Sequence, residues 1–109
     1  MSQNALAIRL YTEVLRTLAF GGISGTYAPL GTALANPARK LLFINDTDVL
    51  ITFSDDGVND KFVLPAGTMF VLDLTLDKGG DYVAQGTRYY VKGAPTVRSV
   101  YLSTWYGSV

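Results

Sequence analysis

Apolar and polar residues alternate in blocks along the middle of the chain, and these blocks predict strands. Between Leu41 and Leu74, three apolar runs rich in β-branched and aromatic residues are separated by two short polar segments. Such runs, bounded by Asn, Asp, Ser and Gly, are typical of strands joined by tight turns. We therefore expect a meander of consecutive antiparallel strands. The expected strands are Lys40–Asn45, Val49–Ser54, Lys61–Leu64 and Thr68–Leu76.

The remaining segments are less regular. Ala5–Phe20 fits an amphipathic helix, but its second half also alternates as a strand, and the β context favours a strand there. We expect Met1–Asn4 to be a flexible arm and residues 21–37 to be a long ordered loop that contains a short strand at Ile23–Tyr27. Two further strands are expected at Thr87–Lys92 and Arg98–Tyr106.

The spacing of the expected strands indicates the fold class. Strands recur about every eight to twelve residues, which is typical of a sandwich or barrel. A chain of 109 residues is the length of one domain. We therefore predict an all-β protein, a single-domain antiparallel β-sandwich of jelly-roll-like form over residues 1–109, with an N-terminal arm.

The sequence lacks the residue types on which most catalytic sites depend. The sequence has no histidine and no cysteine, which removes Ser–His–Asp and Cys–His machinery and ordinary zinc sites. The acidic residues fall mostly in turns, where Asp bonds its own backbone and lacks the burial that acid catalysis requires. The turn Asp55–Asp60 lacks the ligand spacing of a calcium loop. We expect no enzymatic activity, no cofactor and no metal site.

Charge and hydropathy exclude two classes of binding partner. Nine basic and nine acidic residues balance, whereas nucleic-acid binding needs a concentrated basic surface. No apolar run is long enough to span a membrane, and the N-terminus does not read as a signal peptide. We expect neither nucleic acid nor membrane as a partner. A carbohydrate platform built from late aromatic residues stays an alternative; these are Tyr89, Tyr90, Tyr101, Trp105 and Tyr106.

The wording of the central segment resembles small structural proteins of tailed bacteriophages. The resemblance lies in an Asn-x-Thr-Asp turn beginning at Asn45, a Ser-Asp-Asp-Gly turn ending at Gly57, and the Phe-x-x-Pro-Ala-Gly string that begins at Phe62. It extends from about Val14 to Tyr106. It implies a β-sandwich module without enzymatic activity that functions by assembly into the virion, which is put together in the host cytoplasm.

Several roles are compatible with that resemblance. A capsid cement or decoration protein, or a minor head protein, is the leading one. A head–tail connector or tail component forming a ring, and a carbohydrate-binding module of a receptor-binding structure, are the alternatives. The expected partners are the major capsid protein or other virion proteins, together with further copies of the chain in a homo-oligomer. The expected interface residues are Tyr27, Leu30, Tyr101 and Trp105.

Overall fold

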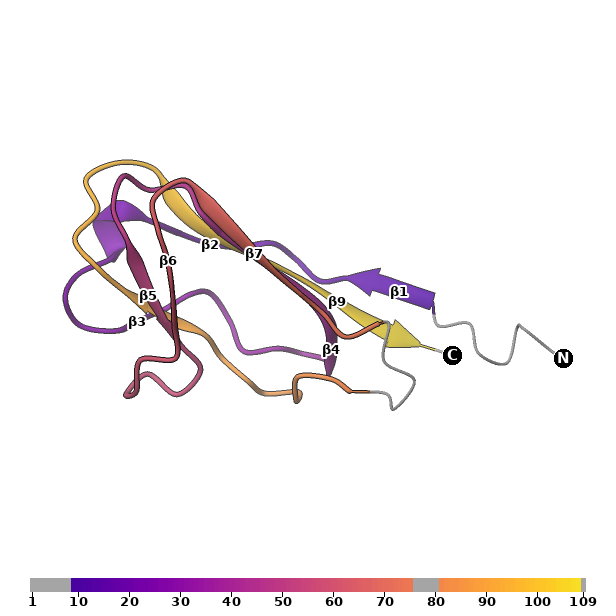
Figure 1. Cartoon of the computed structure of the whole chain (residues 1–109). Coiled ribbons are helices and arrows are strands. Elements are labelled where there is room, and N and C mark those ends of the chain that lie inside the picture. The colour runs from indigo at the N-terminus through magenta and orange to yellow at the C-terminus, as the bar shows by residue number, and fades with distance from the viewer. Residues whose placement is uncertain (1–8, 76–80, 109) are drawn as a thin grey trace, which may run out of the picture.

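Two antiparallel β-sheets pack face to face in the computed structural model, which describes residues 9–75 and 81–108 (Figure 1). The larger sheet contains β1 (Arg9–Thr12), β2 (Arg16–Ala19), β4 (Ala38–Asn45), β7 (Thr68–Asp73) and β9 (Ser99–Ser108). The smaller sheet contains β3 (Ala28–Pro29), β5 (Ile51–Ser54), β6 (Phe62–Leu64) and β8 (Tyr90–Lys92). A short 3-10 turn, η2 (Phe20–Gly22), follows β2.

The order of the strands is that of a jelly roll. The larger sheet runs β1-β9-β4-β7, and β2 also pairs with β9, so that β1 and β2 form one interrupted edge strand. The smaller sheet runs β3-β8-β5-β6. Counted in this way, eight strand positions divide equally between two sheets, as in jelly rolls. The predicted all-β sandwich of jelly-roll-like form is confirmed.

The predicted meander is wrong, because consecutive strands change sheet. β4 belongs to the larger sheet and β5 to the smaller one, and only β5 and β6 form a hairpin within the expected meander. The buried Asn45 explains the change of sheet. Its Nδ2 donates to the carbonyl oxygens of Val49 (2.9 Å) and Leu64 (2.8 Å), which holds the following turn across the sandwich. A side chain that bonds backbone in this way replaces the tight hairpin bond.

The N-terminal part of the chain also departs in places from expectation. The second half of the segment Ala5–Phe20 is a strand, as predicted, since it contains β2, which pairs with β9. The short strand expected at Ile23–Tyr27 is wrong, because β3 begins only at Ala28. Apart from the end of η2 and the two residues of β3, residues 21–37 are irregular. The expected arm at Met1–Asn4 lies outside the described residues.

The core between the sheets is built around Phe43. The ring of Phe43 meets Phe53, Phe62 and Tyr89 edge-on, at centroid distances between 5.0 and 5.7 Å. Edge-to-face contacts of this kind are favourable for aromatic rings beyond the area they bury. The loop over residues 21–37 adds Ile23, Leu30 and Leu34 to the same buried cluster. This loop therefore closes the core of its own domain.

A buried ion pair fixes that loop to the larger sheet. Arg16 Nη2 lies 2.7 Å from Glu13 Oε1, and both side chains are at least nine-tenths buried. Arg16 also donates to the carbonyl oxygen of Thr32 (2.8 Å) and to Thr104 Oγ1 (3.0 Å). Asn36 Nδ2 donates to the second oxygen of Glu13 (2.8 Å). A buried pair is tolerated when its remaining donors and acceptors are satisfied in this way.

The ion pair changes the acidity of Glu13. Burial by itself raises the pKa of Glu13, but hydrogen bonds from Arg16, Asn36 and Thr104 and the charge of Arg16 outweigh it, so the pKa lies below its usual 4.5. A carboxyl whose pKa is lowered by folding stabilises the fold above its unfolded pKa. That contribution is lost as the pH falls through the lowered value.

We predict that Glu13→Ala lowers the free energy of unfolding at pH 7 by about 3 kcal/mol, because it leaves the Arg16 guanidinium buried without its counter-charge. Urea unfolding curves measure the change. The loss should shrink as the pH falls below about 4.5, where Glu13 is protonated in the unfolded wild type.

Asp55→Ala is the control for this variant. Its carboxylate lies 3.4 Å from Lys61, with both side chains 46% exposed, and exposed pairs contribute little. Equal losses for the two variants would show that the Glu13–Arg16 pair is no more important than a surface pair.

Candidate protein-binding surface

The side of the larger sheet that faces away from the core is apolar. Leu41, Phe43 and Asn45 of β4 are buried, and since side chains alternate along a strand, Leu42 and Ile44 face outwards. The same alternation turns three side chains of β7 (Met69, Val71, Asp73) and three of β9 (Tyr101, Ser103, Trp105) outwards. We call the apolar part of this surface the outer face; it consists of Leu42, Ile44, Met69, Val71, Tyr101 and Trp105.

The strand register brings the apolar side chains of the outer face side by side. Ile44 lies between Tyr101 of β9 and Met69 of β7. In the next outward row Leu42 lies between Val71 of β7 and the polar Ser103 of β9. Met69 is 62% exposed and Val71 46% exposed. Strands that are apolar on both faces are typical of sheets covered on both sides. In the described part of the chain only the inner side of β4 is covered, so the outer face has the composition of a contact surface.

A polar row borders the outer face. Lys40 Nζ lies 5.4 Å from the centre of the Trp105 ring, a cation–π arrangement. Asp73, directly across from Lys40 on β7, is exposed. Hydrogen bonds from the Thr75 hydroxyl and backbone N–H, together with the charge of Lys40, lower the pKa of Asp73. This carboxylate therefore stays ionised at neutral pH beside the apolar rows.

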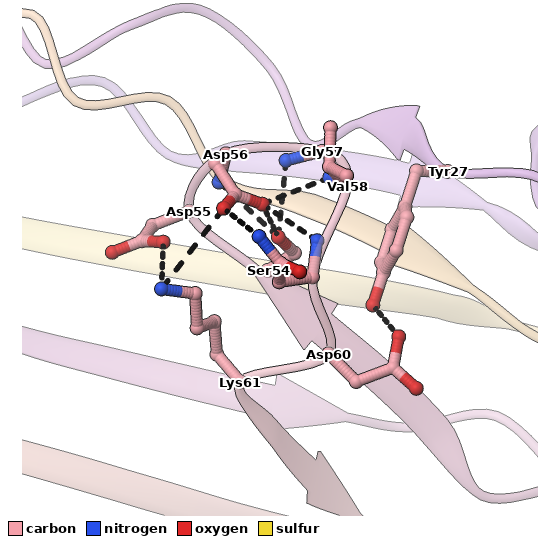
Figure 2. A network of polar contacts seen from close by, with 9 residues as sticks. Tyr27, Ser54, Asp55, Asp56, Gly57, Val58, Asp60 and Lys61 are labelled. Atoms are coloured by element: carbon pink, nitrogen blue, oxygen red, sulfur yellow. Dashed lines mark hydrogen bonds and ion pairs between the residues drawn. The ribbon is translucent and has the colours of Figure 1, made fainter.

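Tyr27 lies elsewhere, beside the β5–β6 turn (Figure 2). Its hydroxyl donates to Asp60 Oδ1, and Lys92 Nζ lies 4.7 Å from the centre of its ring. Lys92 also forms an ion pair with Asp60 at 2.9 Å. Partial burial and the hydrogen bond and charge of Asp60 raise the pKa of Tyr27 to about 12. Tyr27 is thus held by its own domain and is not brought together with Tyr101 and Trp105.

Leu30 corrects one sequence-based expectation. Its side chain is 0% exposed, and its N–H donates to the carbonyl oxygen of Tyr89 at 2.7 Å. The expectation that it offers an apolar surface to a partner is wrong, because the loop folds inwards onto its own core. The aromatic residues of the alternative carbohydrate platform are divided: Tyr89 is buried in the core, whereas Tyr101 and Trp105 belong to the outer face.

The acidic turn between β5 and β6 is closed by its own backbone (Figure 2). Asp56 Oδ1 accepts the N–H groups of Val58 (2.8 Å) and Asn59 (2.9 Å) and the hydroxyl of Ser54 (2.7 Å). These bonds hold the pKa of Asp56 far below its usual value. Within the described residues, no group of three or more His, Cys, Asp or Glu side chains is placed to hold a metal ion.

The apolar residues on β4 and β7 were missed as candidates for an interface. Their signal is present in the sequence: Leu41–Ile44 and Met69–Leu72 are unbroken apolar runs. Unbroken runs indicate strands covered on both faces, whereas strict alternation indicates one covered face.

Comparison with known proteins identifies the fold and no family. No protein-family model matches the chain, and no curated protein is similar to it. One solved structure, from work reporting that Bacillus endospore appendages form a novel family of disulfide-linked pili, aligns with a TM-score of 0.52 at 13% identity over 94% of this chain and 92% of that one. This likeness supports the β-sandwich fold alone. The present sequence has no cysteine.

The described residues contain no helix long and apolar enough to cross a membrane.

We predict opposite outcomes for the two loop residues that the sequence placed together. Leu30→Ala should lower the free energy of unfolding by about 3 kcal/mol, because it leaves a cavity in the core. Tyr27→Ser removes a partly exposed ring and should cost clearly less. Urea unfolding of both variants checks this; a larger loss for Tyr27→Ser would show that the Asp60 contact stabilises more than core burial does.

We further predict that Gly57→Ala lowers the free energy of unfolding by about 1 kcal/mol, because Gly57 has φ of +75° and a Cβ is strained there. Gly25→Ala is the matched control: it has ordinary φ and no atom within 4 Å of the added Cβ. Thermal melts of the two variants measure the difference. Equal melting temperatures would mean that the turn can adopt another backbone conformation.

Proposed function

We propose that this protein is a non-enzymatic structural protein of a tailed-phage particle that binds neighbouring virion proteins through its outer face. The observation that carries the proposal is the apolar surface that Leu42 and Ile44 of β4 form with their outward-facing neighbours on β7 and β9. Burying such a surface against a partner is favourable in proportion to the apolar area removed from water. The resemblance of the central segment to phage structural proteins supports the kind of particle.

The mode of action follows from the shape of this surface. A sheet face is rigid, since its backbone bonds are made before any partner arrives, so binding costs little conformational entropy. Tyr101 and Trp105 supply large rings with one polar group each, the side chains most often found to dominate interface energies. In a particle with many identical sites, modest contacts of this kind are sufficient for firm attachment.

Within the particle, we propose the role of capsid cement or decoration protein, or of minor head protein, with the major capsid protein as the partner. A low charge fraction of 17% suits a subunit that spends its life packed against others. The rival role, a head–tail connector or tail component in a ring, uses the same surface. Copy number separates the two, because a shell position implies hundreds of copies per particle and a ring a dozen or fewer. The intensity of this protein's gel band relative to that of the coat protein measures it.

We predict that Tyr101→Ala weakens attachment of the purified protein to particles assembled without it by about tenfold or more. Tyr101 lies directly beside Ile44 on the outer face, and truncating an interface aromatic residue commonly costs about 2 kcal/mol. Co-sedimentation with particles over a range of protein concentrations gives the apparent Kd.

Tyr82→Ala is the matched control, because Tyr82 is 59% exposed and lies outside the described strands. It should attach as the wild type does. Wild-type attachment by Tyr101→Ala would remove the outer face as the binding surface. Absence of the protein from purified particles would overturn the virion assignment itself.

A further inference from the structure

The strand β7 forms an edge of the larger sheet. Within residues 9–75 and 81–108 it pairs with β4, and no described strand pairs with its other side, which we call the open edge. Its sequence, Thr-Met-Phe-Val-Leu-Asp, is uncharged over the first five positions and contains neither proline nor glycine. Natural proteins usually protect such an edge with charges, proline, bulges or very short strands, because unpaired backbone groups bind other strands.

The backbone groups that point away from β4 can be identified. Leu74 N–H donates to the carbonyl oxygen of Arg39 at 2.8 Å, so Leu74 and Arg39 form a hydrogen-bonded pair. In an antiparallel ladder such pairs alternate with non-bonded ones. Along the register of β4 and β7, the backbones of Thr68, Phe70 and Leu72 therefore face β4, and those of Met69, Val71 and Asp73 face the open edge.

Compared with β7, the other edge strands of the two sheets are less able to pair with a further strand. The β1–β2 edge is interrupted over residues 13–15, and each of its strands has four residues. β3 has two residues, one of which is Pro29. β6 has three residues and follows the charged Lys61. Among the described strands, β7 offers the longest uninterrupted edge at the margin of a sheet.

We propose that β7 pairs with β7 of a second copy of this chain, antiparallel and about a two-fold axis at Val71. Val71 then lies opposite the second copy's Val71, and Met69 lies opposite the second copy's Asp73. These are the residues whose backbone groups face the open edge, so each of these pairs exchanges both backbone hydrogen bonds. The contact is isologous and closes on itself.

The charges and side chains of β7 favour a copy of itself as the partner. In this register the two Asp73 carboxylates are four residues apart along the strand direction, about 13 Å, so no like charges face each other. On the outward side Val71 meets its own counterpart, and β-branched cross-strand pairs of this kind are favourable. The outer faces of the two copies would then join into one apolar surface across the seam.

This inference extends the proposed function by naming one partner, a second copy, and rests on a different feature, the strand edge. A contact between two six-residue strands is smaller than the roughly 1,200 Å² typical of stable complexes. We therefore expect association of the free protein at tens to hundreds of micromolar, strengthened in an assembly by the contacts of the outer face.

The test is sedimentation velocity of the full chain between about 5 µM and 1 mM, with variants designed from the backbone pattern. Val71→Pro removes an N–H that faces the open edge, which an edge strand tolerates, so it should stay folded and monomeric. Thr17→Pro is the matched control. Phe20 N–H donates to the carbonyl oxygen of Arg98, so every second residue before Phe20 on β2 turns its backbone towards β9. The N–H of Thr17 therefore points away from β9, at the opposite edge of the sheet. It should dimerise as the wild type does.

Val71→Lys keeps the test informative if Val71→Pro fails to fold. Val71 is 46% exposed, so lysine is accommodated in the monomer but places two like charges across the axis, and the variant should be monomeric. Slower exchange of the Met69 and Val71 amide hydrogens at high concentration should accompany dimerisation. A wild type that is monomeric at 1 mM, or dimers that persist in Val71→Lys and are lost in Thr17→Pro, would overturn the proposal. Because Val71 also belongs to the outer face, the proposed function is judged on the wild type and on Tyr101→Ala instead. A wild type that stays monomeric at 1 mM but attaches to particles through Tyr101 would overturn this inference and leave the proposed function standing.

Discussion

The packing of Phe43 between the two sheets determines much of what this protein presents to its surroundings. The ring meets Phe53 of β5 and Phe62 of β6 and so joins β4 to the opposite sheet. Because side chains on a strand alternate strictly, turning Phe43 inwards forces its neighbours Leu42 and Ile44 outwards. The outward position of Leu42 and Ile44 in the outer face is thus a consequence of the inward position of Phe43 in the core.

The class of fold was predictable from the sequence, whereas its connectivity was not. Blocks of β-branched and aromatic residues bounded by turn residues located the strands around Phe43, Phe53 and Val100 to within a few residues. A turn sequence does not reveal whether the chain returns beside the previous strand or crosses to the other sheet. Here the choice depends on the Asn45 amide reaching the carbonyl of Leu64, a contact between residues far apart in the sequence.

The candidate surface was only partly predictable for a similar reason. Tyr101 and Trp105, two of the expected interface residues, face outwards because side chains alternate along β9 and the intervening Val100, Leu102 and Thr104 are buried. Leu30 was misplaced because an apolar loop residue can fill the core of its own domain as well as that of a partner. The burial of Arg16 was not predictable, because the sequence does not reveal the four acceptor groups that its guanidinium binds in the fold.

The interrupted edge strand has a mechanical consequence. Arg9 of β1 lies directly opposite Ser108 of β9, so a load that pulls these two residues apart opens the ladder between β1 and β9 one pair at a time. In the described part of the chain, the four pairs of β1 come before the interruption at residues 13–15. Beyond it the load reaches the Glu13–Arg16 pair and the loop anchored to it, where several buried bonds must yield together. The first four residues of the ladder can therefore peel away while the sandwich behind them stays closed.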